Sequence, residues 1–422
     1  MRYSAEISKM LASAGAKEGS VISLTIDGRE FKGTLMQPND PDIIVIRMKS
    51  GYDIGLRVNK GTTIKSTAQP VEKVPTTIDR KPKKGLPNIT LIATGGTIGS
   101  RPGGSPGLSA DALLDMMPEL SEIANISARD TASVFSENIN VKHWQELAKV
   151  IEEELNNGVA GVVVTHGTDT MSFTSAALSF MLREISGPVV ITGAQRSTER
   201  PSSDAYGNLM ASVRFCISSK AAGVYAVMHD TMNDDSYAVH RGTRVRKMHT
   251  SRRDAFRSIN AVPVAHIDGT GNITFRDEVP KASAKTKAVT KMCNDVILLQ
   301  FYPGMDPAVF KDAVMRSKGI VIAGSGLGHV STGIISLLKD AISKGIVVVM
   351  ASQCINGPTG MNVYDTGREL QSIGVIPAGD MLPETAYVKL MWVLANAKDA
   401  KAAMTEALSY EIGERRTVDV VW

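Results

Sequence analysis

Cysteine is scarce in this chain, and long apolar stretches are missing. The 422 residues include only three cysteines, Cys216, Cys293 and Cys354, without the CxxC spacing of a zinc site or a redox pair. We therefore expect buried or idle thiols rather than a disulfide framework or structural zinc. No apolar run reaches the length of a membrane span, and the first residues lack the pattern of a secretion signal, so a cytoplasmic location is expected.

Several motifs of nucleotide and metal chemistry are also missing. The sequence has no GxxxxGK[ST] phosphate-binding loop and no HExxH pair of zinc ligands. The last glycine of residues 324–328 falls one residue early for a dinucleotide loop, and Ala323 stands where the GxSxG elbow of serine hydrolases needs glycine. We therefore expect no metal and no cofactor in this chain. The net charge of only +4 gives no indication of a broad nucleic-acid surface.

The residues that are present are typical of a globular α/β protein. Hydrophobic residues make up 43% of the chain and charged residues 21%, with 37 glycines. A chain of this length exceeds what one hydrophobic core normally serves, so two or three domains are expected.

The N-terminal part, residues 1–69, has the pattern of a helix followed by a small barrel. Apolar residues at helical spacing occur over 4–15. Asp27-Gly28 supplies a hairpin turn, because these residues tolerate positive φ. Five short alternating runs indicate strands and predict an SH3-like module; they are 20–26, 29–36, 43–48, 52–58 and 62–65.

A proline-rich, basic segment at residues 70–87 interrupts this periodicity. Its prolines stiffen the chain and its charges keep it solvated, so we interpret it as a linker. Contact between its basic cluster and RNA is the alternative.

Beyond the linker, apolar strands alternate with amphipathic helices in two stretches. Residues 88–280 have the pattern of a mostly parallel sheet covered by helices on both faces. A charged segment at 281–291 that we predict to contain no strand precedes a second set of strands and helices at 292–422. The sequence therefore predicts that an α/β unit of two lobes follows the barrel along the chain.

The first chemically suggestive run, TGGTIG at residues 94–99, follows the strand predicted at 88–93. Ligand sites in open α/β sheets lie at the carboxyl ends of strands. The two glycines allow close approach of a ligand, and Thr97 supplies a hydroxyl that could attack a carbonyl or hold a phosphate. A simple tight turn would explain the glycines equally well.

A second run, VVVTHGTDTM at residues 162–171, also leads from a strand into a polar turn. We expect it at the same edge of the sheet. Capping of the helix predicted from Ser172 by Asp169 or Thr170 explains one polar residue, but not the whole run. His166 has no partner at metal-ligand spacing and is interpreted as a hydrogen-bonded turn residue.

Together, the TGGTI and HGTDT runs resemble the two signatures of the L-asparaginase/glutaminase family. The resemblance implies an asparaginase-like two-lobed α/β fold and an amidohydrolase activity. It also implies that Thr97 is the nucleophile, that Thr168 is a second catalytic threonine, and that Asp169 binds the α-ammonium group of the substrate.

The family's catalytic lysine corresponds to Lys247 in the run RKMHTS at residues 246–251. By residue type alone, a lysine in so basic a stretch is expected at the surface. A lysine assists a threonine only if its proton can leave, which a neighbouring like charge favours, and Arg244 and Arg246 could supply that charge.

The family's loop for the substrate carboxylate resembles residues 136–140. The resemblance implies that Ser136 and Glu137 bind substrate, while capping of the helix predicted from His143 is the alternative. The glycine- and proline-rich run at 100–109 fits a flexible lid. It lacks the tyrosine that the family usually has there, so the group that activates Thr97 is left open.

Two further runs, residues 193–204 and 240–247, together with the barrel and linker, resemble the D-subunit family of archaeal glutamyl-tRNA(Gln) amidotransferases over nearly the full chain. This resemblance implies glutamine as substrate and a partner, the E subunit of the amidotransferase, that binds Glu-tRNA(Gln) and uses ATP and magnesium. It also implies a homodimer within a heterotetramer. The alternatives are a free-standing L-asparaginase and a catalytically silent RNA-binding scaffold.

Overall fold

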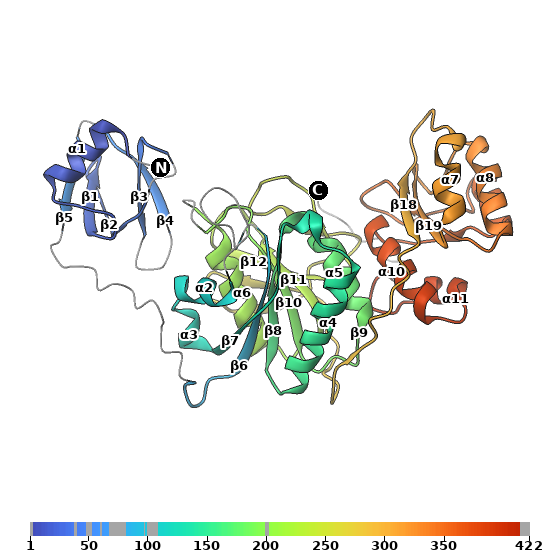
Figure 1. The fold of residues 1–422 in the computed structure, drawn as a ribbon, viewed down its shortest axis with the longest axis horizontal. Coiled ribbons are helices and arrows are strands. Elements are labelled where there is room, and N and C mark those ends of the chain that lie inside the picture. Colours follow the sequence, from blue (N-terminus) through green and yellow to red (C-terminus); the bar gives the residue numbers. More distant parts are fainter. Residues whose placement is uncertain are drawn as a thin grey trace.

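The chain forms a small N-terminal barrel and a larger two-lobed unit (Figure 1). Thr97, most of the lid and most of the linker lie outside the residues that are described. In the computed structural model these are residues 3–37, 40–47, 53–59, 61–66, 82–96, 98, 109–198 and 202–413.

The barrel is a five-stranded antiparallel sheet with one helix. Its strand order is β4-β3-β2-β1-β5, and β1 and β2 are joined at Asp27 and Gly28, whose φ angles of 48° and 75° confirm the predicted hairpin turn. The helix packs its buried Ile7 and Leu11 onto the sheet. The elements are α1 (Ala5–Ser13), β1 (Val21–Ile26), β2 (Arg29–Leu35), β3 (Ile43–Arg47), β4 (Asp53–Arg57) and β5 (Thr63–Ser66).

The first lobe contains an eight-stranded sheet, of which five strands are parallel and three extend one edge antiparallel. The parallel strands, from edge to centre, are β7 (Asn125–Val134), β6 (Asn88–Gly95), β8 (Gly161–Thr165), β10 (Pro188–Thr192) and β11 (Gly223–His229). The antiparallel strands are β12 (Ser236–Arg241), β15 (Ala265–Asp268) and β16 (Ile273–Phe275).

Helices cover both faces of this sheet, as predicted. On one face, α4 (Val141–Asn156) and α5 (Met171–Met181) pack on the sheet. On the other face lie α2 (Ala110–Met116) and α6 (Ala205–Ser218), with the short α3 (Leu120–Ile123) beside them. Two small two-stranded sheets complete the lobe: β13 (Val245–Lys247) with β14 (Phe256–Ser258), and β9 (Leu182–Arg183) with β17 (Lys287–Ala288).

The prediction that residues 281–291 contain no strand is wrong. Lys287 and Ala288 form β17 by pairing with Arg183 and Leu182. The pattern of this two-residue strand is too short to detect in the sequence, and its pairing partner lies about a hundred residues away.

The second lobe is a four-stranded parallel sheet with helices. Its α10 packs against α5 of the first lobe, which joins the two lobes through one apolar core. The strands are β18 (Val296–Gln300), β19 (Gly319–Gly324), β20 (Val347–Ser352) and β21 (Ile376–Pro377). The helices are α7 (Pro307–Arg316), α8 (Thr332–Ser343), α9 (Asp365–Ser372), α10 (Pro383–Asn396) and α11 (Ala400–Thr405).

Residues 406–413, which we call the clasp, run from α11 back to the first lobe. The Thr243 hydroxyl donates to the Ser409 carbonyl at 3.0 Å, and Arg244 Nε donates to the Tyr410 carbonyl at 3.0 Å. The Ser409 hydroxyl in turn donates to the Ser179 carbonyl of α5. The clasp therefore fixes the chain just before Lys247.

None of the described helices combines the length and the apolar character needed to cross a membrane.

Candidate active site

The turns that follow β6 and β8 lie against each other at the carboxyl edge of the sheet. The two strands pair in parallel, with Ala93 opposite Thr165. Gly96, at a φ of +83°, approaches so closely that a Cβ atom there would lie 2.4 Å from the Gly167 nitrogen. Only glycine fits both this φ and this contact. Thr97 follows Gly96 directly, although it lies outside the described residues.

Thr168, Asp169 and Lys247 come together at this edge. Lys247 Nζ donates to Thr168 Oγ1 at 2.8 Å and to Asp169 Oδ1 at 2.8 Å. The Lys247 side chain is only 13% exposed, whereas the Asp169 side chain is 73% exposed. An amine in contact with a hydroxyl and a carboxylate is an arrangement suited to proton transfer.

Lys247 is shielded from solvent. Its two arginine neighbours form ion pairs with carboxylates from distant parts of the chain. Arg244 is buried and pairs with Asp380 at 2.8 Å, and Arg246 lies 3.6 Å from Glu384. Burial raises the pKa of the Glu384 carboxyl, and the nearby Arg246 opposes that shift. Lys247 therefore does not lie at the surface, where residue type alone would place it, and each of the two neighbouring arginines is paired with a carboxylate.

His166 is a buried, neutral part of the site's framework. Its Nδ1 lies 2.7 Å from the Gly167 carbonyl and its Nε2 lies 2.9 Å from the Thr174 hydroxyl. The hydroxyl also accepts from Trp144 Nε1. Nδ1 therefore carries the proton and Nε2 accepts. Burial lowers the pKa of His166 to about 4. The interpretation of His166 as a hydrogen-bonded turn residue is confirmed.

Ser136 lies beside the Gly167 turn, where a Cβ atom on Gly167 would lie 2.6 Å from the Ser136 Cβ. The Thr170 hydroxyl donates to the Ser136 carbonyl at 2.8 Å and makes no cap bond to α5. The cap of α4 is instead Asn140. Capping therefore does not account for Ser136 or Thr170. Ser136 is buried and Glu137 is exposed.

An open cavity of about 350 Å³ lies between the lobes next to Asp169 and Lys247. Sequence reasoning missed the residues that the second lobe contributes, because no motif marks them. The lining residues of the first lobe are Asp169, Ser172, Phe173, Arg246 and Lys247, and those of the second are Leu298, Gln300, Ala323, Gln353, Pro383 and Glu384. In the described part of the chain, no group of three or more His, Cys, Asp and Glu side chains is arranged to hold a metal ion.

Models of known families match almost the whole chain. Residues 16–66 match the GatD N-terminal domain, residues 88–281 match the N-terminal domain of asparaginase, and residues 295–405 match the glutaminase/asparaginase C-terminal domain.

Solved L-asparaginases share the two-lobed fold. The thermostable L-asparaginase from Thermococcus kodakarensis aligns with a TM-score of 0.70 and 30% identity over 78% of this chain and 99% of that one. A probable cytoplasmic L-asparaginase from Campylobacter jejuni aligns with a TM-score of 0.66 and 30% identity, over 75% of this chain and 98% of that one. The predicted asparaginase-like fold is confirmed.

Curated relatives extend the similarity to both ends of the chain. The D subunit of the glutamyl-tRNA(Gln) amidotransferase of Pyrococcus furiosus is 44% identical over 97% of each chain. The corresponding D subunit of Thermofilum pendens is 40% identical over 99% of this chain and 98% of its own. This chain therefore belongs to the D-subunit family of glutamyl-tRNA(Gln) amidotransferases.

Proposed function

We propose that this chain is the glutamine-hydrolysing subunit of a glutamyl-tRNA(Gln) amidotransferase, with Thr97, Thr168, Asp169 and Lys247 as its catalytic residues. The observation that carries the proposal is the contact of Lys247 Nζ with both Thr168 Oγ1 and Asp169 Oδ1, at 2.8 Å each, beside the turn that leads to Thr97. The near full-length similarity to D-subunit relatives supports glutamine as the substrate.

The proposed reaction has two half-reactions. The Thr97 hydroxyl attacks the side-chain amide carbon of glutamine, and the carbon–nitrogen bond breaks. The leaving nitrogen takes up the proton that the hydroxyl loses and departs as ammonia. Water then attacks the resulting ester, which releases glutamate and restores the hydroxyl.

Thr168 and Lys247 are proposed to move protons during both half-reactions, because their polar atoms are in hydrogen-bond contact. Asp169 directs one oxygen to Lys247, and its exposed carboxylate can also accept from the α-ammonium group of the substrate. Ser136, together with Glu137, is proposed to bind the substrate's backbone end, since both begin the turn beside Gly167.

A partner must complete the reaction. We assign the activation of Glu-tRNA(Gln), with ATP and magnesium, to an E subunit of the amidotransferase, since this sequence has no phosphate-binding loop. A dimer of this chain within a heterotetramer in the cytoplasm completes the proposal. The ammonia released here would then amidate the glutamyl group on the tRNA.

A free-standing L-asparaginase is the second candidate, because solved L-asparaginases share the catalytic lobes. These structures match only 75–78% of the chain, whereas the N-terminal barrel matches the GatD N-terminal domain. The barrel therefore favours the amidotransferase.

The deciding experiment compares ammonia release from glutamine by this chain alone and by the chain with the E subunit and Glu-tRNA(Gln). We expect the complex to be faster, since a partner that stabilises the competent state raises the rate. Equal rates, or a preference for asparagine in both conditions, would support the asparaginase.

Substitutions test the individual roles. Thr97→Ala should abolish ammonia release, and a trapped acyl-enzyme should map to Thr97 rather than Thr168. Lys247→Met should lose about 10²–10⁴-fold in rate, the usual contribution of a proton-transfer group. Lys247→Arg should rescue poorly, because a guanidinium does not deprotonate in proteins. Full activity in the Lys247 variants would remove the lysine from the mechanism.

A further inference from the structure

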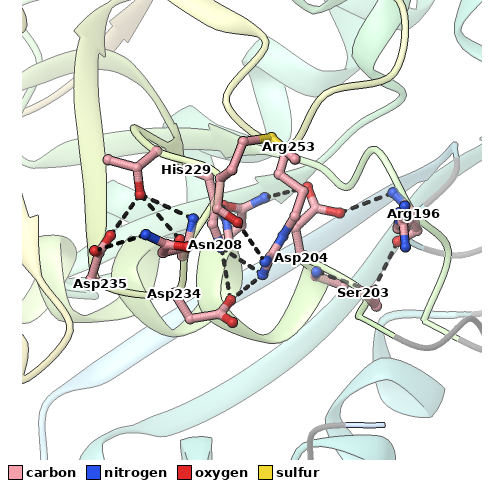
Figure 2. A network of polar contacts seen from close by, with 12 residues as sticks. Arg196, Ser203, Asp204, Asn208, His229, Asp234, Asp235 and Arg253 are labelled. Carbon is pink, nitrogen blue, oxygen red and sulfur yellow. Dashed lines mark hydrogen bonds and ion pairs between the residues drawn. The ribbon is translucent and has the colours of Figure 1, made fainter. Parts of the chain in front are cut away.

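A buried histidine outside the catalytic set faces two separate segments of the first lobe. His229 ends β11 and has no exposed surface. Its Nδ1 lies 2.6 Å from Asn208 Oδ1, and its Nε2 lies 3.1 Å from Asp234 Oδ1 and 3.0 Å from Arg253 Nη2 (Figure 2). Neither Asn208 nor Arg253 belongs to the catalytic set.

The first of these segments is the turn after β10, which begins at Gly193 and packs against Thr168. Asn208 Nδ2 donates to the Gly193 carbonyl at 2.9 Å and to Asp204 Oδ2 at 3.1 Å. The buried Asp204 carboxylate also accepts from the backbone nitrogens of Gln195 and Arg196 (Figure 2).

Because both Asn208 amide hydrogens face acceptors, its oxygen faces His229, and His229 Nδ1 carries a proton. Gly193, whose carbonyl accepts the hydrogen bond from Asn208, lies against the turn that carries Thr168. A Cβ atom on Gly193 would lie 3.1 Å from Thr168 Cγ2 and 2.5 Å from the His166 carbonyl. The position of the Gly193 turn therefore limits where Thr168 can lie.

The second segment is the hairpin of β13 and β14, which carries Lys247. Arg253 lies in the turn of this hairpin, with its side chain 9% exposed. It pairs with Asp234, contacts His229 Nε2 and donates to the Met232 carbonyl at 3.0 Å. Lys247 pairs with Phe256 across the hairpin, so fixing the turn fixes the backbone of the lysine.

We propose that Arg253, His229 and Asn208 are positioning residues that hold the Lys247 hairpin and the Gly193 turn in register, so that Lys247 Nζ stays within reach of Thr168. The inference rests on the proposed function, because it assigns these residues to the same amide hydrolysis. A displacement of about 1 Å in a catalytic group can cost about 10²-fold in rate. A hydrogen-bond network that joins the Lys247 hairpin to the Gly193 turn through the His229 ring restricts such displacements.

The test measures kcat and KM for glutamine in the complex with the E subunit and Glu-tRNA(Gln). Arg253→Met should lower kcat by about 10²-fold with little change in KM, because the substrate-binding groups stay in place. Arg252→Met is the matched control. Arg252 lies in the same turn and pairs with Asp254, which keeps a second partner in Arg257. This control should retain the kcat of the unmodified complex.

A double-substitution cycle separates positioning from general stability. If Arg253 acts through Lys247, adding Arg253→Met to the Lys247→Met chain should cause almost no further loss. The same loss of kcat in both backgrounds would overturn the inference, as would an unchanged kcat in Arg253→Met alone.

Should Arg253→Met fail to fold, Arg253→Lys supports the same cycle. It keeps the charge beside Asp234 but cannot also reach His229 and the Met232 carbonyl. We therefore expect an intermediate loss of kcat, and no further loss when Arg253→Lys is added to the Lys247→Met chain. A complex that releases no ammonia with the unmodified chain would contradict the proposed function. An active complex whose Arg253 and Lys247 effects simply multiply would contradict only the positioning role.

Discussion

Lys389 Nζ lies 2.7 Å from Glu411 Oε1, and neither side chain has any exposed surface. The ammonium also donates to the carbonyls of Met404 and Glu406 at 3.0 and 2.6 Å, while the carboxylate accepts from the backbone of the clasp. This pair attaches the clasp to α10, and the clasp in turn accepts hydrogen bonds from the Thr243 and Arg244 side chains, which precede Lys247.

We predict that Glu411→Ala destabilises the protein by about 3–5 kcal/mol, because it leaves a buried ammonium without its counter-ion. Urea and thermal unfolding would measure the loss. The double variant Lys389→Met with Glu411→Leu should recover most of it, since two apolar side chains can replace a buried ion pair. A Glu411→Ala protein as stable as the unmodified one would show that the ion pair makes no net contribution to the free energy of unfolding.

The contact between Gly96 and Gly167 predicts that Gly96→Ala inactivates the enzyme. Its added Cβ would lie 2.4 Å from the Gly167 nitrogen, so the turns that follow β6 and β8 must separate. We expect a loss of at least about 10²-fold in ammonia release.

Gly158→Ala is the matched control for this prediction. Gly158 has a similar φ of +89°, but a Cβ there would have no neighbour within 4 Å. Both variants therefore carry a similar backbone strain of about 1 kcal/mol, and only Gly96→Ala should lose activity. Equal activities in the two variants would mean that the contact between the turns is unimportant for catalysis.

His166 should make the fold sensitive to acid. Burial lowers the pKa of His166 to about 4, from 6.5, so the folded state binds this proton less readily than the unfolded state does. Stability should therefore fall as the pH drops from about 6.5 to about 4. The difference in pKa corresponds to about 3 kcal/mol. Urea unfolding at several pH values would measure it, and a non-titrating His166→Asn variant should show a shallower fall. Parallel curves for the two proteins would contradict the prediction.

Deletion of residues 1–86 should leave a folded catalytic unit. The apolar core described for the barrel contains only barrel residues, so its removal exposes no core of the lobes. We expect an unchanged melting temperature of the lobes and weaker binding to the E subunit or to tRNA, measured by calorimetry or gel shift. Normal assembly and normal transamidation by the truncated chain would assign the barrel another role.

Local patterns predicted much of the fold. The hairpin at Asp27-Gly28 and strand β8 occur where turn chemistry and apolar runs placed them. The antiparallel strands β12, β15 and β16 were not identified, and β17 was missed. Such short strands are defined by the partners that they find in the folded chain rather than by a pattern of their own.

For the site, the sequence predicted the types of residue better than their surroundings. The signature runs identified Thr168 and Lys247, which the structure brings into contact. The two arginines just before Lys247 in sequence pair with Asp380 and Glu384, single acids more than 130 residues further along the chain. Their position is set by the packing of α10 on α5, which no local pattern reveals.

The contact between Thr168 and Lys247 joins residues 79 positions apart in sequence, and this separation bears on synthesis at the ribosome. A nascent chain can pair β6 with β8 before Lys247 has been made, so the sheet can form while the site is still incomplete. With Lys247 in its proposed role, activity can arise only after the β13–β14 hairpin has folded against the finished sheet. A growing chain is therefore unable to release ammonia before most of its first lobe has emerged.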